Sequence, residues 1–236
     1  MNFTLIGSII ISIIPAFILG FYIYNMDKVE KEPKGLLVKL FIGGVFAVLL
    51  TAIISDMMKL LLPNLTNLKS TDLEVQLFYN FILVALVEEI CKWLFLIICS
   101  WRNKNFNFLF DGIVYSVFVA LGFATLENIM YAIAYYGDLT ILLLRAVLSV
   151  PAHVFFGIYM GFFYGKGKML KHKKGKYISA LFLSLIVPVI LHGIFDFCLT
   201  GNHWSYIIIY ILFMIVLYII SFKRVSKVSL NDKYFK

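Results

Sequence analysis

The stretch that decides the fold is LFYNFILVALVEEICKWLFLIICSW, residues 77–101. Its 25 residues exceed the roughly 20 that an α-helix needs to cross about 30 Å of hydrocarbon. Two adjacent glutamates, Glu88 and Glu89, stand near its centre, and Lys92 follows one turn later. An ionisable side chain inside a bilayer costs several kcal/mol, so it indicates a functional site. The stretch therefore predicts a membrane helix that contributes residues to a functional site.

The whole chain has the composition of a membrane protein. Of its 236 residues, 62% are hydrophobic and 14% are charged, and the mean hydropathy is +0.94. Soluble domains have about 45–50% apolar and about 25% charged residues, and a chain of this length cannot bury such an excess. The composition excludes a water-soluble enzyme, a nucleic-acid-binding domain and a disordered chain. We therefore predict that the chain is embedded in a lipid bilayer.

Seven apolar runs are long enough to span a bilayer. We therefore predict an all-α, polytopic bundle that forms one domain over residues 1–236. The predicted spans are residues 3–24, 36–62, 77–101, 108–136, 139–164, 177–199 and 205–222. Within the fifth span, Gly157, Gly161 and Gly165 form a ladder of small residues that predicts close helix packing.

The basic residues divide unequally between the two sets of connecting segments. Sixteen of them lie in the loops around residues 28–34, 102–104 and 166–176 and in the C-terminal tail, whereas the opposite set holds Lys69 alone. Cytoplasmic loops of membrane proteins carry the excess of Lys and Arg. We therefore predict a multi-pass protein of the cell membrane with its N-terminus outside and its C-terminus in the cytoplasm.

Side chains able to ionise or form hydrogen bonds recur in the next three predicted spans. They are Glu127 and Asn128 in the fourth, Arg145 and His153 in the fifth, and His192 and Asp196 in the sixth. Asp196 follows His192 by one turn and can accept its ring N–H, as second-shell carboxylates do. The helical rise of about 1.5 Å per residue places the glutamates and histidines in one zone between the midplane and the outer face. We predict that they converge.

Plain structural roles compete with this prediction. Lys92 can neutralise one glutamate at i+3 or i+4 and leave the other free, whereas an ion pair that only locks helix packing is the less favoured alternative. Glu127 could be protonated and inert, and a single histidine could only bond neighbouring helices. His153 follows a proline by two residues, and His192 follows another by four. This repetition favours a catalytic role for the two histidines.

In this order, the motifs resemble the PrsW family of intramembrane proteases. Glu88-Glu89-x-x-Lys92, Phe123-x-x-x-Glu127-Asn128, His153 and His192-x-x-x-Asp196 carry the resemblance, over about half the chain. It implies a catalytic core at about residues 77–199. The family is similar in turn to the CAAX prenyl endopeptidases, which usually have His in place of Glu127 and often Asn in place of Asp196. Farnesylated substrates are therefore not implied.

The resemblance implies a protease of the bacterial plasma membrane. Its substrate would be a single-pass anti-sigma factor, cut on the extracytoplasmic side as the first (site-1) step of regulated proteolysis. It implies that Glu88, Glu89, His153 and His192 are catalytic. The predicted supporting residues are Lys92, Glu127, Asn128, Arg145 and Asp196.

The residue types suggest how peptide hydrolysis would proceed. It needs a base for water and a donor for the oxyanion; Glu89 or Glu88 can be the base, and His153 or His192 the donor. Glu89, His153 and His192 are also an acceptable ligand set for catalytic zinc, although no H-E-x-x-H motif is present. The residues leave a metal-free mechanism and one that uses a divalent metal such as zinc both open.

Two other classes of protein compete with a protease. A proton- or ion-coupled transporter could use the same carboxylates and histidines as a relay, but the chain lacks the internal repeats typical of such folds. A non-catalytic scaffold would not need polar residues that converge.

Overall fold

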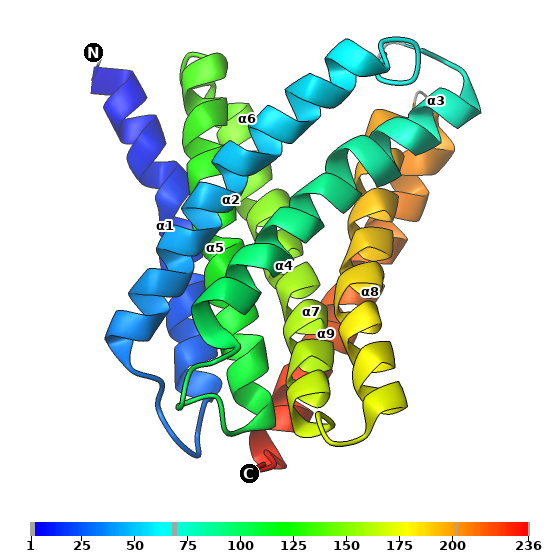
Figure 1. Cartoon of the computed structure of the whole chain (residues 1–236). Coiled ribbons are helices and arrows are strands. Elements are labelled where there is room, and N and C mark those ends of the chain that lie inside the picture. Colours follow the sequence, from blue (N-terminus) through cyan, green and yellow to red (C-terminus); the bar gives the residue numbers. More distant parts are fainter. Residues whose placement is uncertain (1–2, 68–69, 202, 236) are drawn as a thin grey trace.

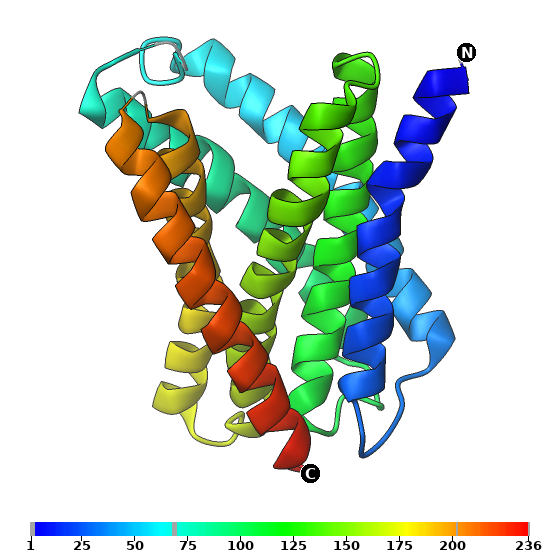
Figure 2. The ribbon, with the colours of Figure 1, turned by 180° about the vertical axis from the view of Figure 1, so that it is seen from behind.

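The computed structural model describes residues 3–67, 70–201 and 203–235. Within these ranges the chain forms seven continuous helical stretches that lie side by side (Figures 1 and 2), and the single β-bridge joins Phe108 and Tyr234. The stretches are α1 (Phe3–Met26), α2 (Lys34–Leu61), α3–η1–α4 (Leu73–Leu77, Phe78–Leu86, Val87–Ser100), α5 (Leu109–Ala134), α6–η2–α7 (Leu139–Leu144, Arg145–Ser149, Val150–Met169), α8 (Lys174–Thr200) and α9 (Trp204–Leu230). The predicted all-α fold is confirmed.

Six of the described stretches are long and apolar enough to cross a membrane. The seventh, α3–η1–α4, is the one that carries Glu88, Glu89 and Lys92. Several helices run past the predicted span boundaries; α9, for example, ends at Leu230 and not near residue 222. The difference arises because backbone hydrogen bonding continues beyond the point where the apolar run stops.

Helix α5 forms the centre of the bundle and packs against α1, α2, α4 and α7. Two of these contacts bring backbones together at glycine. A Cβ on Gly44 in α2 would lie 1.9 Å from the carbonyl oxygen of Val119, and a Cβ on Gly161 in α7 would lie 2.2 Å from that of Gly112. Only a residue without a side chain allows such an approach. The close packing predicted from the glycine ladder is confirmed at Gly161.

Two helical stretches contain π-helical segments, η1 and η2, directly before the turns that carry Glu88 and His153. Pro151 follows η2 and has no N–H to donate to the carbonyl of Val147. The hydroxyl of Tyr218 in α9 donates to that carbonyl at 3.2 Å. Segments of this type are often found at functional sites.

The connecting segments that hold most of the basic residues meet at one end of the bundle, where the C-terminus lies (Figure 1). There the amide of Leu109 donates to the carbonyl of Lys233 at 3.1 Å, which ties the start of α5 to the tail. Two of the basic residues in the connecting segments and the tail, Lys69 and Lys236, lie outside the described residues. Most of the basic residues in the connecting segments thus lie at the end of the bundle that holds the C-terminus. The orientation of the bundle in the membrane stays a prediction.

Candidate active site

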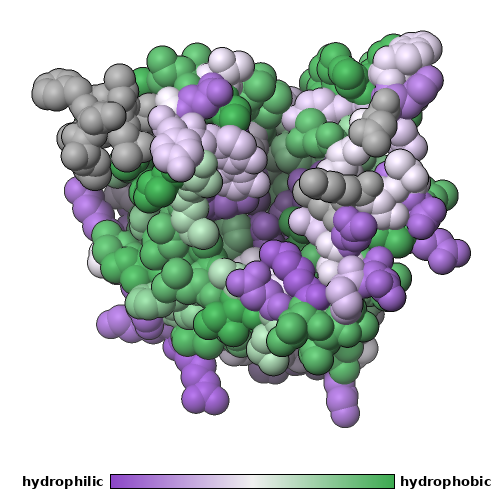
Figure 3. All heavy atoms as spheres, turned by 90° about the horizontal axis from the view of Figure 1, so that it is seen from above, coloured by the Kyte–Doolittle hydropathy of each residue, from purple (hydrophilic) through white to green (hydrophobic). Residues whose placement is uncertain are grey.

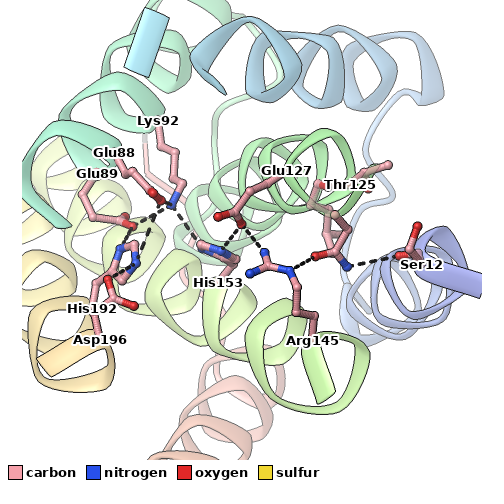
Figure 4. A network of polar contacts seen from close by, with 12 residues as sticks. Ser12, Glu88, Glu89, Lys92, Thr125, Glu127, Arg145, His153, His192 and Asp196 are labelled. Atoms are coloured by element: carbon pink, nitrogen blue, oxygen red, sulfur yellow. Dashed lines mark hydrogen bonds and ion pairs between the residues drawn. The ribbon is translucent and has the colours of Figure 1, made fainter. Parts of the chain in front are cut away.

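The end of the bundle opposite the C-terminus is hollowed at its centre, and hydrophilic residues lie deep in the hollow (Figure 3). The four residues predicted to be catalytic come together inside the bundle: Glu88 and Glu89 from α4, His153 from α7 and His192 from α8 (Figure 4). Each offers an oxygen or nitrogen atom within 4.8 Å of the others, and all four are buried. The predicted convergence is therefore present in the structure, whereas the catalytic role of each residue stays a prediction.

Lys92 supplies the positive charge inside this cluster. Its Nζ atom donates to Glu89 Oε1 at 2.8 Å, to Glu88 Oε2 at 3.2 Å and to His153 Nδ1 at 3.1 Å, and it lies 3.9 Å from the centre of the Phe123 ring. The prediction that Lys92 leaves one glutamate free is wrong. Both i+3 and i+4 spacings bring a lysine within reach on a helix, and here the ammonium contacts both carboxylates at once.

These contacts determine the tautomer of His153. An ammonium only donates, so the Nδ1 atom of a neutral His153 must accept and Nε2 must carry the proton. Nε2 lies 3.1 Å from Glu127 Oε2, which accepts it. Arg145 donates to the same oxygen at 2.7 Å. Glu127 is therefore an ion-paired acceptor that holds the His153 ring, and the alternative of a protonated, inert Glu127 is wrong.

Asn128 extends this network to the first helix. Its Oδ1 atom accepts from Nε of Arg145 at 2.8 Å, and its Nδ2 atom donates to the carbonyl of Ser12 at 3.3 Å. Sequence reasoning placed the core at residues 77–199 and missed the contribution of α1. A serine in an apolar helix gives no signal that its own backbone carbonyl accepts a hydrogen bond from another helix.

His192 lies between carboxylates on both sides of its ring. Its Nδ1 atom is 2.9 Å from Glu89 Oε1, and its Nε2 atom is 3.2 Å from Asp196 Oδ2 and 3.9 Å from Glu88 Oε2. The predicted neighbour relation between His192 and Asp196 is present. A neutral imidazole donates from only one nitrogen, so a second proton or a metal ion has to satisfy the other side.

The two histidines share one arrangement. Each directs Nε2 toward a carboxylate at the edge of the cluster, Glu127 for His153 and Asp196 for His192, and each directs Nδ1 toward its interior. Metal-ligating histidines in proteins are oriented by a second-shell carboxylate in this way. The Oε2 atom of Glu89 is buried and has no hydrogen-bond partner. The residues present therefore fit a divalent metal ion held by Glu89, His153 and His192.

Fold and site together define a class: a multi-pass helical membrane protein with a buried centre of two glutamates and two histidines. The family model described as "PrsW family intramembrane metalloprotease" matches residues 32–221. The chain belongs to the PrsW family. It is thus a membrane protease of a bacterial, multi-pass type, and the transporter alternative is not favoured.

Individual relatives agree with this family over nearly the whole chain. Protease PrsW of Clostridioides difficile (strain 630) is 37% identical over 229 residues, covering 95% of this chain and 92% of the relative. Protease PrsW of Oceanobacillus iheyensis is 34% identical, covering 93% and 94%, and that of Bacillus subtilis (strain 168) is 34% identical, covering 91% and 92%. No solved structure matches the chain.

Proposed function

We propose that the protein is an intramembrane endopeptidase that hydrolyses a peptide bond near the extracytoplasmic boundary of a single-pass membrane protein of the anti-sigma-factor type. It acts as one domain, with a catalytic core at about residues 77–199. The observation that carries the proposal is the buried cluster of Glu88, Glu89, His153 and His192, which lies on three different helices.

Charge balance in the polar network supports a metal ion. The network contains four carboxylates and two permanent cations, so neutral histidines leave an excess of two negative charges: Glu88, Glu89, Glu127 and Asp196 against Lys92 and Arg145. Buried charges are stable only when they are paired. A divalent ion would balance this excess.

In the proposed mechanism the two glutamates have different roles. Glu89 is fully buried and bonded to Lys92 and His192, whereas the side chain of Glu88 is 10% exposed. Glu88 is therefore the base that takes a proton from the attacking water, and Glu89, His153 and His192 are the residues that would hold a metal ion. A bound divalent ion would polarise the scissile carbonyl and favour ionisation of water.

The remaining residues keep these groups in place. Lys92 holds both carboxylates through its two ion pairs. Glu127 and Asp196 orient the two histidine rings, which is a positioning role. Phe156 stacks on His192 with ring centres 4.8 Å apart, and Phe123 packs its ring against Lys92.

The place of cleavage follows from the predicted orientation. Positive charge at the C-terminal end puts that end in the cytoplasm, so the hollow opens to the outside, where water enters. A helix hides its carbonyls in backbone hydrogen bonds, so the substrate must enter as an extended segment. The cut then falls at or just outside the outer boundary, and the cytoplasmic part stays anchored for a second protease.

The test is cleavage of a co-reconstituted single-pass anti-sigma factor by the purified protein in liposomes. Glu88→Gln and Glu89→Gln should each abolish most of the cleavage. A matched control is Asp56→Asn, which changes an exposed carboxylate paired with Lys59 and should leave the rate unchanged. Mass spectrometry of the fragments locates the cut; a cut in the cytoplasmic third of the substrate span, or normal cleavage by Glu89→Gln, would contradict the proposal.

A further inference from the structure

A second buried cluster of carboxylates lies at the other end of the molecule. Asp27 follows the last residue of α1, Glu32 lies in the loop before α2, and Asp111 is in the first turn of α5. One oxygen of each lies within 4.8 Å of the others, and the residues are only 1%, 3% and 1% exposed. Asp111 and Glu127 belong to the same helix, 16 positions or about 24 Å apart at the helical rise. The cluster is therefore separate from the active site.

The hydrogen bonds of these carboxylates are incomplete. Glu32 Oε2 accepts from the hydroxyl of Tyr115 at 2.7 Å, and Asp111 Oδ2 accepts from the amides of Asn107 and Phe108 at 2.9 and 2.7 Å. The remaining Asp111 oxygen, Oδ1, and Oδ2 of Asp27 are both buried without a partner. Two carboxylate oxygens thus have no donor to satisfy them.

No lysine or arginine in the described part of the chain forms an ion pair with the cluster. Lys31, whose charge acts on Asp27, donates a hydrogen bond to the carbonyl of Tyr24 at 2.6 Å. Burial raises the pKa of Asp27 to about 6 and that of Glu32 to about 7, although Lys31 and Tyr115 act in the opposite direction. Three buried, ionised carboxylates without an ion-pair partner are unfavourable here, so the cluster needs either protons or a bound cation.

We propose that Asp27, Glu32 and Asp111 bind a hard divalent cation of the Ca²⁺ or Mg²⁺ type. An all-oxygen donor set with several carboxylates is what these ions prefer, in contrast to the mixed Glu and His set of the active site, which suits zinc. The unpartnered oxygens of Asp27 and Asp111 supply ligand positions that nothing else occupies.

The ion would add a link between three segments of the chain. It would connect the end of α1, the loop into α2 and the start of α5, the helix that also carries Glu127 and Asn128. Asp232 extends this region because its Oδ1 atom accepts from the amide of Phe110 at 2.9 Å. The site is thus structural and fixes the end of the central helix.

The test is binding of Ca²⁺ to detergent-purified, chelator-treated protein, measured by equilibrium dialysis, with Mg²⁺ as competitor. Wild-type protein should bind Ca²⁺ at this site, and its unfolding temperature should rise by several degrees at saturation, because a ligand that binds only the native state stabilises it. Asp27→Asn should weaken binding at least tenfold; its Oδ2 atom has no partner to lose, so the variant should fold. Glu32→Gln provides a second variant of similar shape.

Two controls separate this site from others. Asp56→Asn removes an exposed carboxylate, and Glu89→Gln alters only the active site; both should bind Ca²⁺ as wild type does. Binding lost in Glu89→Gln but retained in Asp27→Asn would place the ion in the active site and overturn the proposal. Absence of Ca²⁺ and Mg²⁺ binding to wild-type protein would also overturn it, because the carboxylates would then carry protons.

Discussion

The Nε2 atom of His153 lies 3.1 Å from Oε2 of Glu127, although the two residues are 26 positions apart and belong to different helices. This contact turns Nδ1 of the ring toward Lys92 and the two glutamates. Glu127 is in turn fixed by Arg145, which donates to the same oxygen. The supporting residues thus form a chain of contacts behind the histidine.

The first prediction concerns Glu127. Glu127→Gln removes the ion pair with Arg145 and weakens the hold on the ring of His153. We expect zinc affinity and the cleavage rate each to fall about 10- to 100-fold, the usual cost of losing a carboxylate that orients a metal-binding histidine. Zinc titration of the purified variant measures the first effect without relying on activity. Glu74→Gln, at an exposed glutamate of α3, is the control, and equal zinc affinity in the two variants would contradict the positioning role.

The second prediction concerns Lys92. Lys92→Met leaves two buried carboxylates without their cation, so the metal-free variant should lose about 3–5 kcal/mol of unfolding free energy. The same change removes a positive charge that repels a metal ion. Zinc affinity should therefore rise by about tenfold or more, since the repulsion between an ammonium and a nearby divalent ion exceeds about 1.4 kcal/mol in a partly buried site.

Added zinc should raise the unfolding temperature of Lys92→Met by more than it raises that of the wild-type protein. Thermal unfolding with chelator and with excess zinc measures both effects. Zinc affinity lower than that of wild type would show that the ammonium assists the metal and does not compete with it.

The third prediction concerns the contact between α2 and α5. A methyl group on Gly44 would lie 1.9 Å from the carbonyl oxygen of Val119, a backbone atom that cannot move aside. Gly44→Ala should lower the unfolding free energy by about 1–3 kcal/mol or more, the usual cost of overpacking. In the same helix, Gly35→Ala places its methyl group where no atom lies within 4 Å and should be neutral or slightly stabilising. Equal unfolding temperatures for the two variants would refute the close contact.

The fourth prediction concerns orientation. A cysteine in place of exposed Lys171 should be protected from a membrane-impermeant thiol reagent added outside intact cells. A cysteine in place of exposed Thr71 should react, because the segment between α2 and α3 lies at the other end of the bundle (Figure 1). The native cysteines are all buried and should give little background. The reverse pattern of labelling would invert the topology.

Much of this molecule could be predicted from its sequence because the apolar runs are long and because ionisable residues lie inside them. Each predicted span became a helical stretch because an α-helix satisfies its backbone hydrogen bonds within the segment itself, as lipid requires. Glu88, Glu89, His153 and His192 stood out because ionisable groups are costly there.

The features that could not be predicted depend on tertiary contacts. Asp27 and Glu32 read as ordinary loop residues, and only the packing of helix ends brings them to Asp111. The link from Asn128 to Ser12 uses a backbone carbonyl, which the sequence cannot single out.

The two π-helical segments differ in how a change of length would affect the active site. A π-helical turn holds more residues than an α-helical one, and deleting one residue from it changes the orientation of the part of the helix before it relative to the part after it. In η1 (Phe78–Leu86) such a deletion would swivel the short helix before it and leave Glu88 in place. In η2 it would turn Arg145 away from Glu127. Insertions and deletions in η1 would therefore change the approach to the cluster of glutamates and histidines. Those in η2 would remove the contact between Arg145 and Glu127, which holds the ring of His153. Substitution experiments do not sample such changes of length.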